Sequence, residues 1–220
     1  MHKACLPNEG WKVLRDLSGI VAKYRAVLAG ETALALRLGH RISLDLDFFT
    51  DAEFDSEKVI SAMRKTRFSF RVLSEAKGSL IMEADGVKTS LLFYEYPFLD
   101  KPTLFHKIPI AGLLDIAAMK IIAINQRGTK RDFIDLFFVL QNVPFHKIAE
   151  HMVKRFGRER INPVQIGKSL VYFADVEADP DPEYTRGNES DWQMIKTFFR
   201  NHVKQFTFDM DICVKKTAHP

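Results

Sequence analysis

The sequence predicts an α/β fold of the α+β type, with an α/β lobe over residues 1–110 followed by a mainly helical lobe over residues 111–220. Apolar stretches of strand length, separated by turn residues, are confined to the first half of the chain. From about residue 112 onward, apolar residues recur at helical spacing. The chain has 220 residues, 46% of them apolar, which is enough to build a core for both lobes.

The first lobe is expected to begin with helices and to continue with strands. Gly39 follows the second helix and suits a left-handed cap. Asp85 and Gly86 form a dipeptide typical of a hairpin turn. The expected elements, in order, are helices over residues 11–24 and 31–38, the latter preceded by the strand-like AVLA, a strand over 43–50, β structure over 68–96 and the short apolar piece IPIAG.

The second lobe is expected to consist of helices. Thr129 with Asp132, and Ser190 with Gln193, are spaced as capping boxes that open two of them. The acidic, proline-bearing segment 175–191 is expected to be an exposed linker. The expected helices span residues 112–126, 130–141, 145–156, 164–174 and 191–205.

Composition argues against a membrane or secreted protein. The sequence has no run of 18 apolar residues, and its first ten residues lack a signal-peptide core, so a cytoplasmic protein with no membrane span is expected. Cys5 and Cys213 show no paired or metal-ligand spacing and are expected to be reduced thiols.

The net charge of +4 comes from the second half, where residues 101–220 hold 18 basic and 14 acidic side chains. Within it, residues 147–168 contain six basic side chains against two acidic ones. Such a stretch could contact a polyanion such as RNA. It is equally typical of a solvated helix face.

Two aspartates, Asp45 and Asp47, lie one residue apart in the apolar segment SLDLDFFT. Side chains alternate along a strand, so both carboxylates should point to one face, with Cα atoms roughly 6.6 Å apart. Two like charges this close need a counter-charge. Oxygen ligands favour a hard divalent cation, Mg²⁺ or Mn²⁺. The alternative is that Arg37 or Arg41 pairs with them.

Gly30 lies where the strand-like AVLA meets the next helix. The free backbone N–H groups of a helix start can hold a phosphate. Gly30 could also serve chain geometry alone.

Lys120 has apolar residues three and four positions away on both sides, so its ammonium group should need an anion. The alternative is that the lysine snorkels from a helix edge. Arg127 follows seven residues later on nearly the same side of the helix. Asp135 has apolar helical neighbours, and it could pair with Arg131 or require another partner.

Gly30, flanked by Ala29 and Glu31 and followed after thirteen residues by Asp45-Leu46-Asp47, resembles the signature of the nucleotidyltransferase fold. More specifically, LAGETALALRLGHRISLDLDFFT together with KIIAINQRGTKRDFIDL resembles the AbiEii/AbiGii toxin family of nucleotidyltransferase-like proteins, over roughly residues 12–205. The resemblance implies a two-lobed fold with a mixed β-sheet, an NTP substrate and Mg²⁺. In some members it implies a toxin that adds nucleotides to a tRNA 3′ end and is opposed by an antitoxin encoded beside it.

The resemblance also implies a role for individual residues. Carried over, Asp45 and Asp47 would hold the metal, and Asp132 would be the base for the attacking hydroxyl. The residues expected to contact the nucleotide are Gly30, Thr32, Lys120 and Arg127.

Two departures from the family pattern bear on activity. Glu31 stands where the family usually has a second glycine, and it adds negative charge beside the expected triphosphate. Ser90 falls near the position of a third carboxylate, for which Glu83 or Glu95 could substitute. Three hypotheses result: a metal-dependent nucleotidyltransferase acting on RNA, a non-catalytic nucleotide-binding or regulatory protein on the same fold, and a metal-dependent phosphohydrolase or nuclease.

Overall fold

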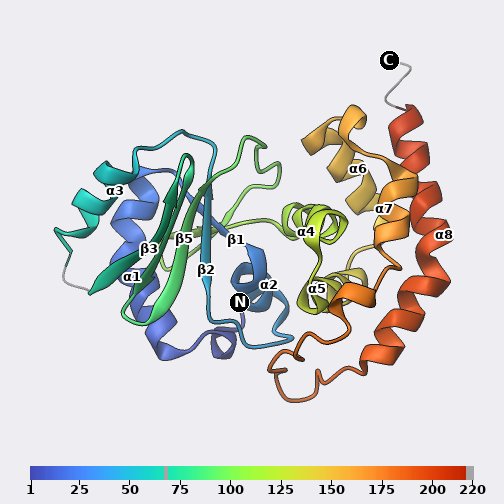
Figure 1. Cartoon of the computed structure of the whole chain (residues 1–220), viewed down its shortest axis with the longest axis horizontal. Helices are drawn as coiled ribbons and strands as arrows, with labels where there is room; N and C mark the ends of the chain where they lie inside the picture. Colours follow the sequence, from blue (N-terminus) through green and yellow to red (C-terminus); the bar gives the residue numbers. More distant parts are fainter. Residues whose placement is uncertain (67–68, 217–220) are drawn as a thin grey trace. The chain divides into compact units, whose positions relative to one another are not determined.

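The computed structural model describes residues 1–66 and 69–216. The chain divides into two compact units, Met1–Gly112 and Leu113–Pro220. The first unit contains a mixed β-sheet with helices, and the described part of the second is mainly helical (Figure 1). The predicted α+β fold is therefore confirmed. Phe68, where β structure was expected to begin, lies outside the described residues.

The sheet of the first unit has seven strands within the described residues, in the order β3-β4-β5-β2-β1-β7-β6. The central strand β2 pairs antiparallel with β1 and parallel with β5. The expected AVLA segment forms β1. The strands are β1 Val27–Ala29, β2 Leu46–Thr50, β3 Phe70–Ala76, β4 Ser79–Ala84, β5 Val87–Phe93, β6 Thr103–Phe105 and β7 Ile108–Ile110.

The helices α1 and α3 cover one face of this sheet (Figure 1). Leu17 of α1 and Val59 of α3 lie with Phe48 of β2 in the apolar layer between helices and sheet. Since side chains alternate along β2, Asp47 faces the opposite side. Gly39 caps α2 with φ of 74°, as predicted. The helices are the short 3₁₀-helix η1 Lys3–Cys5, α1 Asn8–Lys23, α2 Gly30–Leu38 and α3 Ser56–Met63.

A tight turn joins β4 to β5. Asp85 and Gly86 have φ of 45° and 82°, and the flanking residues Ala84 and Val87 are paired. Two consecutive positive φ angles match the type I′ turn that suits the twist of a hairpin. The hairpin predicted from this dipeptide is confirmed.

The strand β2 begins later than predicted, at Leu46 rather than Ser43. The Ser43 N–H donates to the carbonyl of Cys5 at 2.9 Å, which draws this segment out of the ladder. Leu44 is 62% exposed and therefore does not share the buried face of Leu46 and Phe48.

The second unit contains all five expected helices. Phe133 of α5 lies at its centre, with its ring centroid 5.1 Å from that of Phe173 and 5.6 Å from that of Phe199. No helix in the described residues is both long and apolar enough to cross a membrane. The helices are α4 Leu113–Arg127, α5 Lys130–Leu140, α6 Phe145–Phe156, η2 Arg158–Arg160, α7 Pro163–Ser169, η3 Ala174–Val176 and α8 Trp192–Lys216.

The last helices differ from prediction at their ends. The helix α7 stops at Ser169, five residues early, and α8 continues eleven residues beyond 205. The extension packs against α6, because the ring of Phe206 stacks on that of Phe145 with centroids 4.2 Å apart. The cap of α8 is Asp191, whose Oδ1 accepts from the N–H of Gln193 at 2.6 Å. The predicted Ser190 cap was therefore one residue off.

The segment predicted to be an exposed linker is attached to the helical unit. Lys130 of α5 donates to the carbonyl of Asp179 at 3.0 Å and pairs with the carboxylate of Asp181 at 2.9 Å. The backbone N–H of Lys130 also donates to the Asp179 carboxylate at 2.9 Å. These contacts fix the path of the chain between η3 and α8.

Candidate functional site

Asp47 lies at the centre of the sheet, flanked by the two strands that pair with β2. It is in register with Ala29 of β1 on one side and with Ser90 of β5 on the other. Gly30 follows Ala29 with φ of 66°, and a Cβ atom there would lie 3.2 Å from Oδ2 of Asp47. The glycine thus starts α2 in a conformation that side chains rarely adopt and keeps the space beside the carboxylate open.

The environment of Asp47 disfavours its charged form. Burial raises the pKa of Asp47, the hydrogen bond from Ser90 opposes this, and the negative charges of Asp45 and Glu31 raise the pKa further. Lys88 is the cation that partly offsets them. Burial together with two neighbouring carboxylates makes this position suited to a cation.

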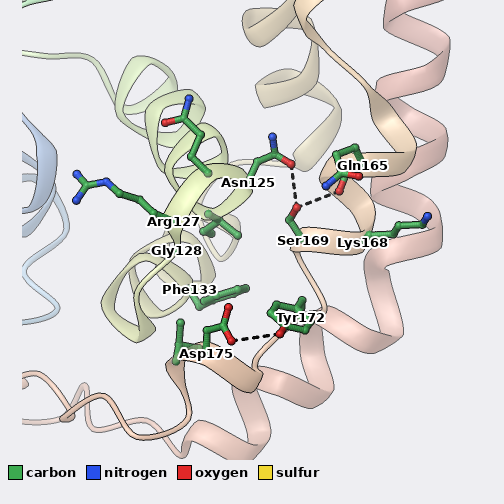
Figure 2. Close-up of a pocket in the computed structure, with 12 residues that line it drawn as sticks. Asn125, Arg127, Gly128, Phe133, Gln165, Lys168, Ser169, Tyr172 and Asp175 are labelled. Carbon is green, nitrogen blue, oxygen red and sulfur yellow. Dashed lines mark hydrogen bonds between the residues drawn. The ribbon is translucent and has the colours of Figure 1, made fainter.

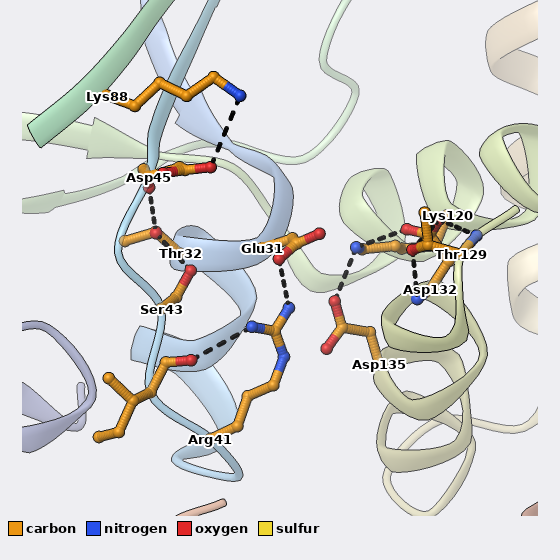
Figure 3. Close-up of polar contacts among 11 residues, drawn as sticks. Glu31, Thr32, Arg41, Ser43, Asp45, Lys88, Lys120, Thr129, Asp132 and Asp135 are labelled. Carbon is orange, nitrogen blue, oxygen red and sulfur yellow. Dashed lines mark hydrogen bonds and ion pairs between the residues drawn. The ribbon is translucent and has the colours of Figure 1, made fainter. Parts of the chain in front are cut away.

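Asp45 is more open than Asp47. Its carboxylate lies 3.9 Å from Nζ of Lys88, and both side chains are about half-exposed (Figure 3). The two arginines proposed as alternative partners have other contacts. Arg37 donates to the carbonyl of Ala111, and Arg41 pairs with Glu31 at 2.9 Å.

Thr32 is a positioning residue for the acidic segment. Its side chain is buried, and its hydroxyl lies 2.7 Å from that of Ser43 and donates to the carbonyl of Asp45 (Figure 3). The hydroxyl therefore holds the loop that leads into β2. That this residue also borders a triphosphate stays a prediction.

Glu31 has a structural partner that the sequence did not reveal. The Arg41 side chain is 2% exposed and its guanidinium pairs with the Glu31 carboxylate, which is 25% exposed. Arg41 also donates to the carbonyl of Ile42. The negative charge that departs from the family pattern thus neutralises a buried cation.

Replacing Glu31 with glutamine is expected to lower the free energy of unfolding by about 2 kcal/mol, because it removes the charge opposite a buried guanidinium. The loss stays below that of a fully buried pair because the Glu31 carboxylate is partly open to solvent. The same change should tighten NTP binding, since it removes a negative charge at the start of α2. Urea unfolding and calorimetric NTP titration measure the two effects. Glu53→Gln, which alters an exposed acid of the same unit, is the control and should change neither. Unchanged stability would contradict the role given to the pair.

A buried polar cluster joins α4 to α5. Nζ of Lys120 lies 2.8 Å from Oδ1 of Asp132 and 2.7 Å from Oδ2 of Asp135 (Figure 3). The Lys120 side chain is 6% exposed, so the snorkelling alternative was wrong and the predicted need for an anion is confirmed. Asp132 and Asp135 supply the anions, and Lys120 is in turn the partner that the apolar neighbours of Asp135 called for.

Asp132 has two structural tasks. It forms the predicted capping box, in which its Oδ2 accepts from the N–H and the hydroxyl of Thr129, both at 2.9 Å. Its Oδ1 accepts from Lys120. These bonds use three of roughly four lone-pair sites of a carboxylate. The Asp132 carboxylate is therefore held in a fixed orientation.

The remaining predicted residues are spread over the two units. Arg127 is exposed at the end of α4, seven residues or about 10 Å along the helix axis from Lys120. Ser90 lies beside Asp47, where a third carboxylate was expected. Glu83 on β4 is bound to Arg71 at 3.0 Å, and Glu95 is exposed beyond the end of β5.

The basic stretch 147–168 is divided between surface and core. Lys154, Arg158 and Arg160 are exposed, whereas the Arg155 side chain is fully buried. Arg155 lies 3.2 Å from the carboxylate of Asp115, which also contacts Nε2 of His151 at 2.9 Å. Arg155 therefore belongs to a buried ion cluster and is not part of a basic surface that could meet a polyanion.

Sequence comparison identifies relatives of the chain. The model of the AbiEii family, described as nucleotidyl transferase AbiEii toxin of a type IV toxin–antitoxin system, matches residues 92–209. The acidic residues 45 and 47 precede this matched region. An uncharacterized protein of Aquifex aeolicus (strain VF5), aq_aa25, is 41% identical over 184 residues, which cover 81% of this chain and 86% of that protein.

Solved structures share the fold. MenT4, a nucleotidyltransferase toxin from Mycobacterium tuberculosis, superposes with a TM-score of 0.63 at 20% identity, covering 92% of this chain and 85% of MenT4. JHP933 from Helicobacter pylori superposes with a TM-score of 0.51 at 18% identity, covering 95% of this chain and 93% of JHP933. At 20% and 18% sequence identity, these comparisons establish a shared fold only.

Proposed function

Because the chain belongs to the AbiEii nucleotidyltransferase toxin family, we propose that it transfers a nucleotide from an NTP to an RNA acceptor in a metal-dependent reaction. The acceptor proposed is the 3′ end of a tRNA, and the protein would act as a toxin opposed by an antitoxin encoded beside it. The observation that carries the proposal is the position of Asp47, partly buried beside Gly30 at the start of α2 and close to the charges of Asp45 and Glu31.

The donor set fits a divalent cation. The carboxylates of Asp45 and Asp47 offer hard oxygen ligands, and burial together with neighbouring negative charge leaves Asp47 in need of positive charge. Mg²⁺ or Mn²⁺ bound there would supply charge neutralisation for the triphosphate. The backbone amides at the start of α2 are proposed to contact phosphate oxygens, which Gly30 allows to approach closely.

The helical unit is proposed to supply the proton acceptor. In nucleotidyl transfer, the acceptor hydroxyl forms a new bond to the α-phosphorus, the bond to the β-phosphate oxygen breaks, and pyrophosphate leaves. Asp132 would take the hydroxyl proton on its oxygen that faces Lys120. Lys120 holds this carboxylate in place. It would also contribute positive charge to the phosphates. Positioning and charge neutralisation suffice for such chemistry.

A second function is favoured by Ser90. A serine occupies the place beside Asp47 where a third carboxylate would assist metal binding. A protein with only two metal-binding carboxylates could bind a nucleotide without transferring it. This alternative is a nucleotide-binding or regulatory protein on the same fold.

Incubation of the purified protein with each α-labelled NTP, Mg²⁺ and total tRNA distinguishes these functions. Transfer of label to RNA is the expected result. NTP binding without transfer would support the regulatory alternative. Shortened RNA would instead indicate a nuclease or phosphohydrolase that uses the same two aspartates. Replacing Mg²⁺ with EDTA should abolish transfer, and activity that persists in EDTA would overturn the metal-dependent proposal.

A further inference from the structure

A cavity of about 510 Å³ lies wholly within the second unit, between the end of α4, the helix α7 and the segment that follows α7. Its volume is in the range of small-molecule and nucleotide sites, roughly 300–1,000 Å³. It is separate from the acidic residues of the sheet and from the Lys120 cluster, neither of which lines it. The residues that matter for recognition are Asn125, Arg127, Gln165, Lys168, Ser169 and Tyr172.

The cavity offers an aromatic ring to a ligand. Tyr172 is 57% exposed. Its hydroxyl donates to Asp175 at 3.2 Å, which fixes the tip of the ring while its face stays accessible (Figure 2). A fixed, exposed aromatic ring is a platform on which a base can stack.

Two amide side chains line the same cavity. The Ser169 hydroxyl lies 2.8 Å from Oδ1 of Asn125 and 3.0 Å from the carbonyl of Gln165, and this contact orients the Asn125 amide. The side chain of Gln165 is exposed at the same wall of the cavity. Amide side chains both donate and accept hydrogen bonds, so they can bind the edge of an unpaired base.

Two cations border the cavity on different sides. In Figure 2, Arg127 and Lys168 extend in opposite directions away from the group formed by Asn125, Ser169 and Tyr172. A free mononucleotide carries phosphate at one end only. A chain that crosses the cavity has a phosphate on either side of the bound nucleotide and can reach both cations. The arrangement therefore favours a polynucleotide.

We propose that this cavity holds one unstacked nucleotide of a single-stranded RNA, with its base on Tyr172, its base edge at Asn125 and Gln165, and its flanking phosphates at Arg127 and Lys168. The identification of this RNA with the acceptor rests on the proposed function. In this proposal Arg127 binds a phosphate of the acceptor RNA rather than the NTP. The carboxylate of Asp175, held by the tyrosine hydroxyl, lies at the base end, where it can accept from an exocyclic amine.

Fluorescence anisotropy with a labelled 12-nucleotide single-stranded RNA, without NTP or metal, tests the inference on the full chain. Tyr172→Ala should weaken RNA binding about ten-fold, the effect of losing one stacked base. Tyr172→Phe keeps the ring and should bind like the wild type. Phe208→Ala is the matched control, because Phe208 of α8 is also 57% exposed but does not line the cavity.

The outcomes separate this inference from the transferase proposal. Loss of RNA affinity in Tyr172→Ala alone supports the cavity, even if the wild type transfers no label. Unchanged affinity in Tyr172→Ala, or equal losses in Tyr172→Ala and Phe208→Ala, would overturn it, even if transfer is observed. Thermal melts of the three variants identify any loss of RNA affinity that is due to unfolding. If Tyr172→Ala unfolds, Tyr172→Phe still shows whether RNA binding depends on the aromatic ring or on the hydroxyl.

Discussion

Lys120→Met is expected to lower the free energy of unfolding by about 3–5 kcal/mol, the range found when one member of a buried ion pair is removed. The methionine fills a similar volume, but the carboxylates of Asp132 and Asp135 lose the cation that lies within 2.8 Å of each. Asp135 is fully buried, so water cannot replace the lysine without rearrangement. Urea unfolding at neutral pH gives the measurement.

Two further variants make this result specific. Lys215→Met removes the lysine of an exposed ion pair with Asp211 on α8 and should have no measurable effect. Adding Asp135→Leu to Lys120→Met removes one stranded carboxylate and should recover part of the lost stability. If Lys120→Met costs no more than Lys215→Met, the buried cluster does not stabilise the helical unit as the distances indicate.

The sequence predicted the members of this cluster but not their pairing. Apolar neighbours at helical spacing marked Lys120 and Asp135 as buried, and the capping box placed Asp132 at the start of α5. Each residue was recognised by a pattern within its own helix. Their pairing depends on how α4 packs against α5, which no local pattern specifies.

The burial of Arg155 follows from its position on the helix face, which a charge count does not register. His151 and Arg155 are four residues apart on α6, next to the apolar positions Ile148 and Met152. That spacing places both on the buried side of the helix, where a basic side chain requires an acid. Counting charges along 147–168 concealed this orientation, because a count takes no account of the helix face.

Near Asp45 and Asp47, the contacts made by loop residues could not be predicted from the sequence. Arg41 and Ser43 lie in the irregular segment before β2, where no periodicity indicates direction. The pairing of Arg41 with Glu31 and the bond from Ser43 to Cys5 depend on chain segments brought together by folding. The prediction that Asp45 and Asp47 share a face assumed that both lie in the strand, but β2 begins only at Leu46. The alternation rule thus applies directly to Asp47, while Asp45 is placed by the loop and by Thr32.

Asp47→Asn is expected to abolish nucleotide transfer, with a loss of activity of more than about 100-fold. Changing a residue that only hydrogen-bonds to a metal ligand costs roughly 10–100-fold in activity, and removing the ligand itself should cost more. Asparagine has nearly the same shape and can keep a hydrogen bond with Ser90, so the fold should persist. Mg²⁺ with NTP should stabilise the wild type against heat and should leave the variant unchanged. Asp51→Asn, which alters an exposed acid just after β2, is the control and should respond like the wild type.

Without metal, the variant should be as stable as the wild type or more so, and the difference should depend on pH. The pKa of Asp47 is raised in the folded state above its ordinary value of 3.8. Below that value the carboxyl is protonated in both folded and unfolded chains, so its burial carries no charge penalty. As the pH rises through the folded pKa, the wild type must bury a charge and loses stability, whereas Asp47→Asn does not. Melting curves in EDTA from pH 4 to 7 should therefore diverge in favour of the variant. A variant less stable than the wild type at pH 7, together with a wild type indifferent to Mg²⁺, would mean that Asp47 has a cationic protein partner and would overturn its assignment as a metal ligand.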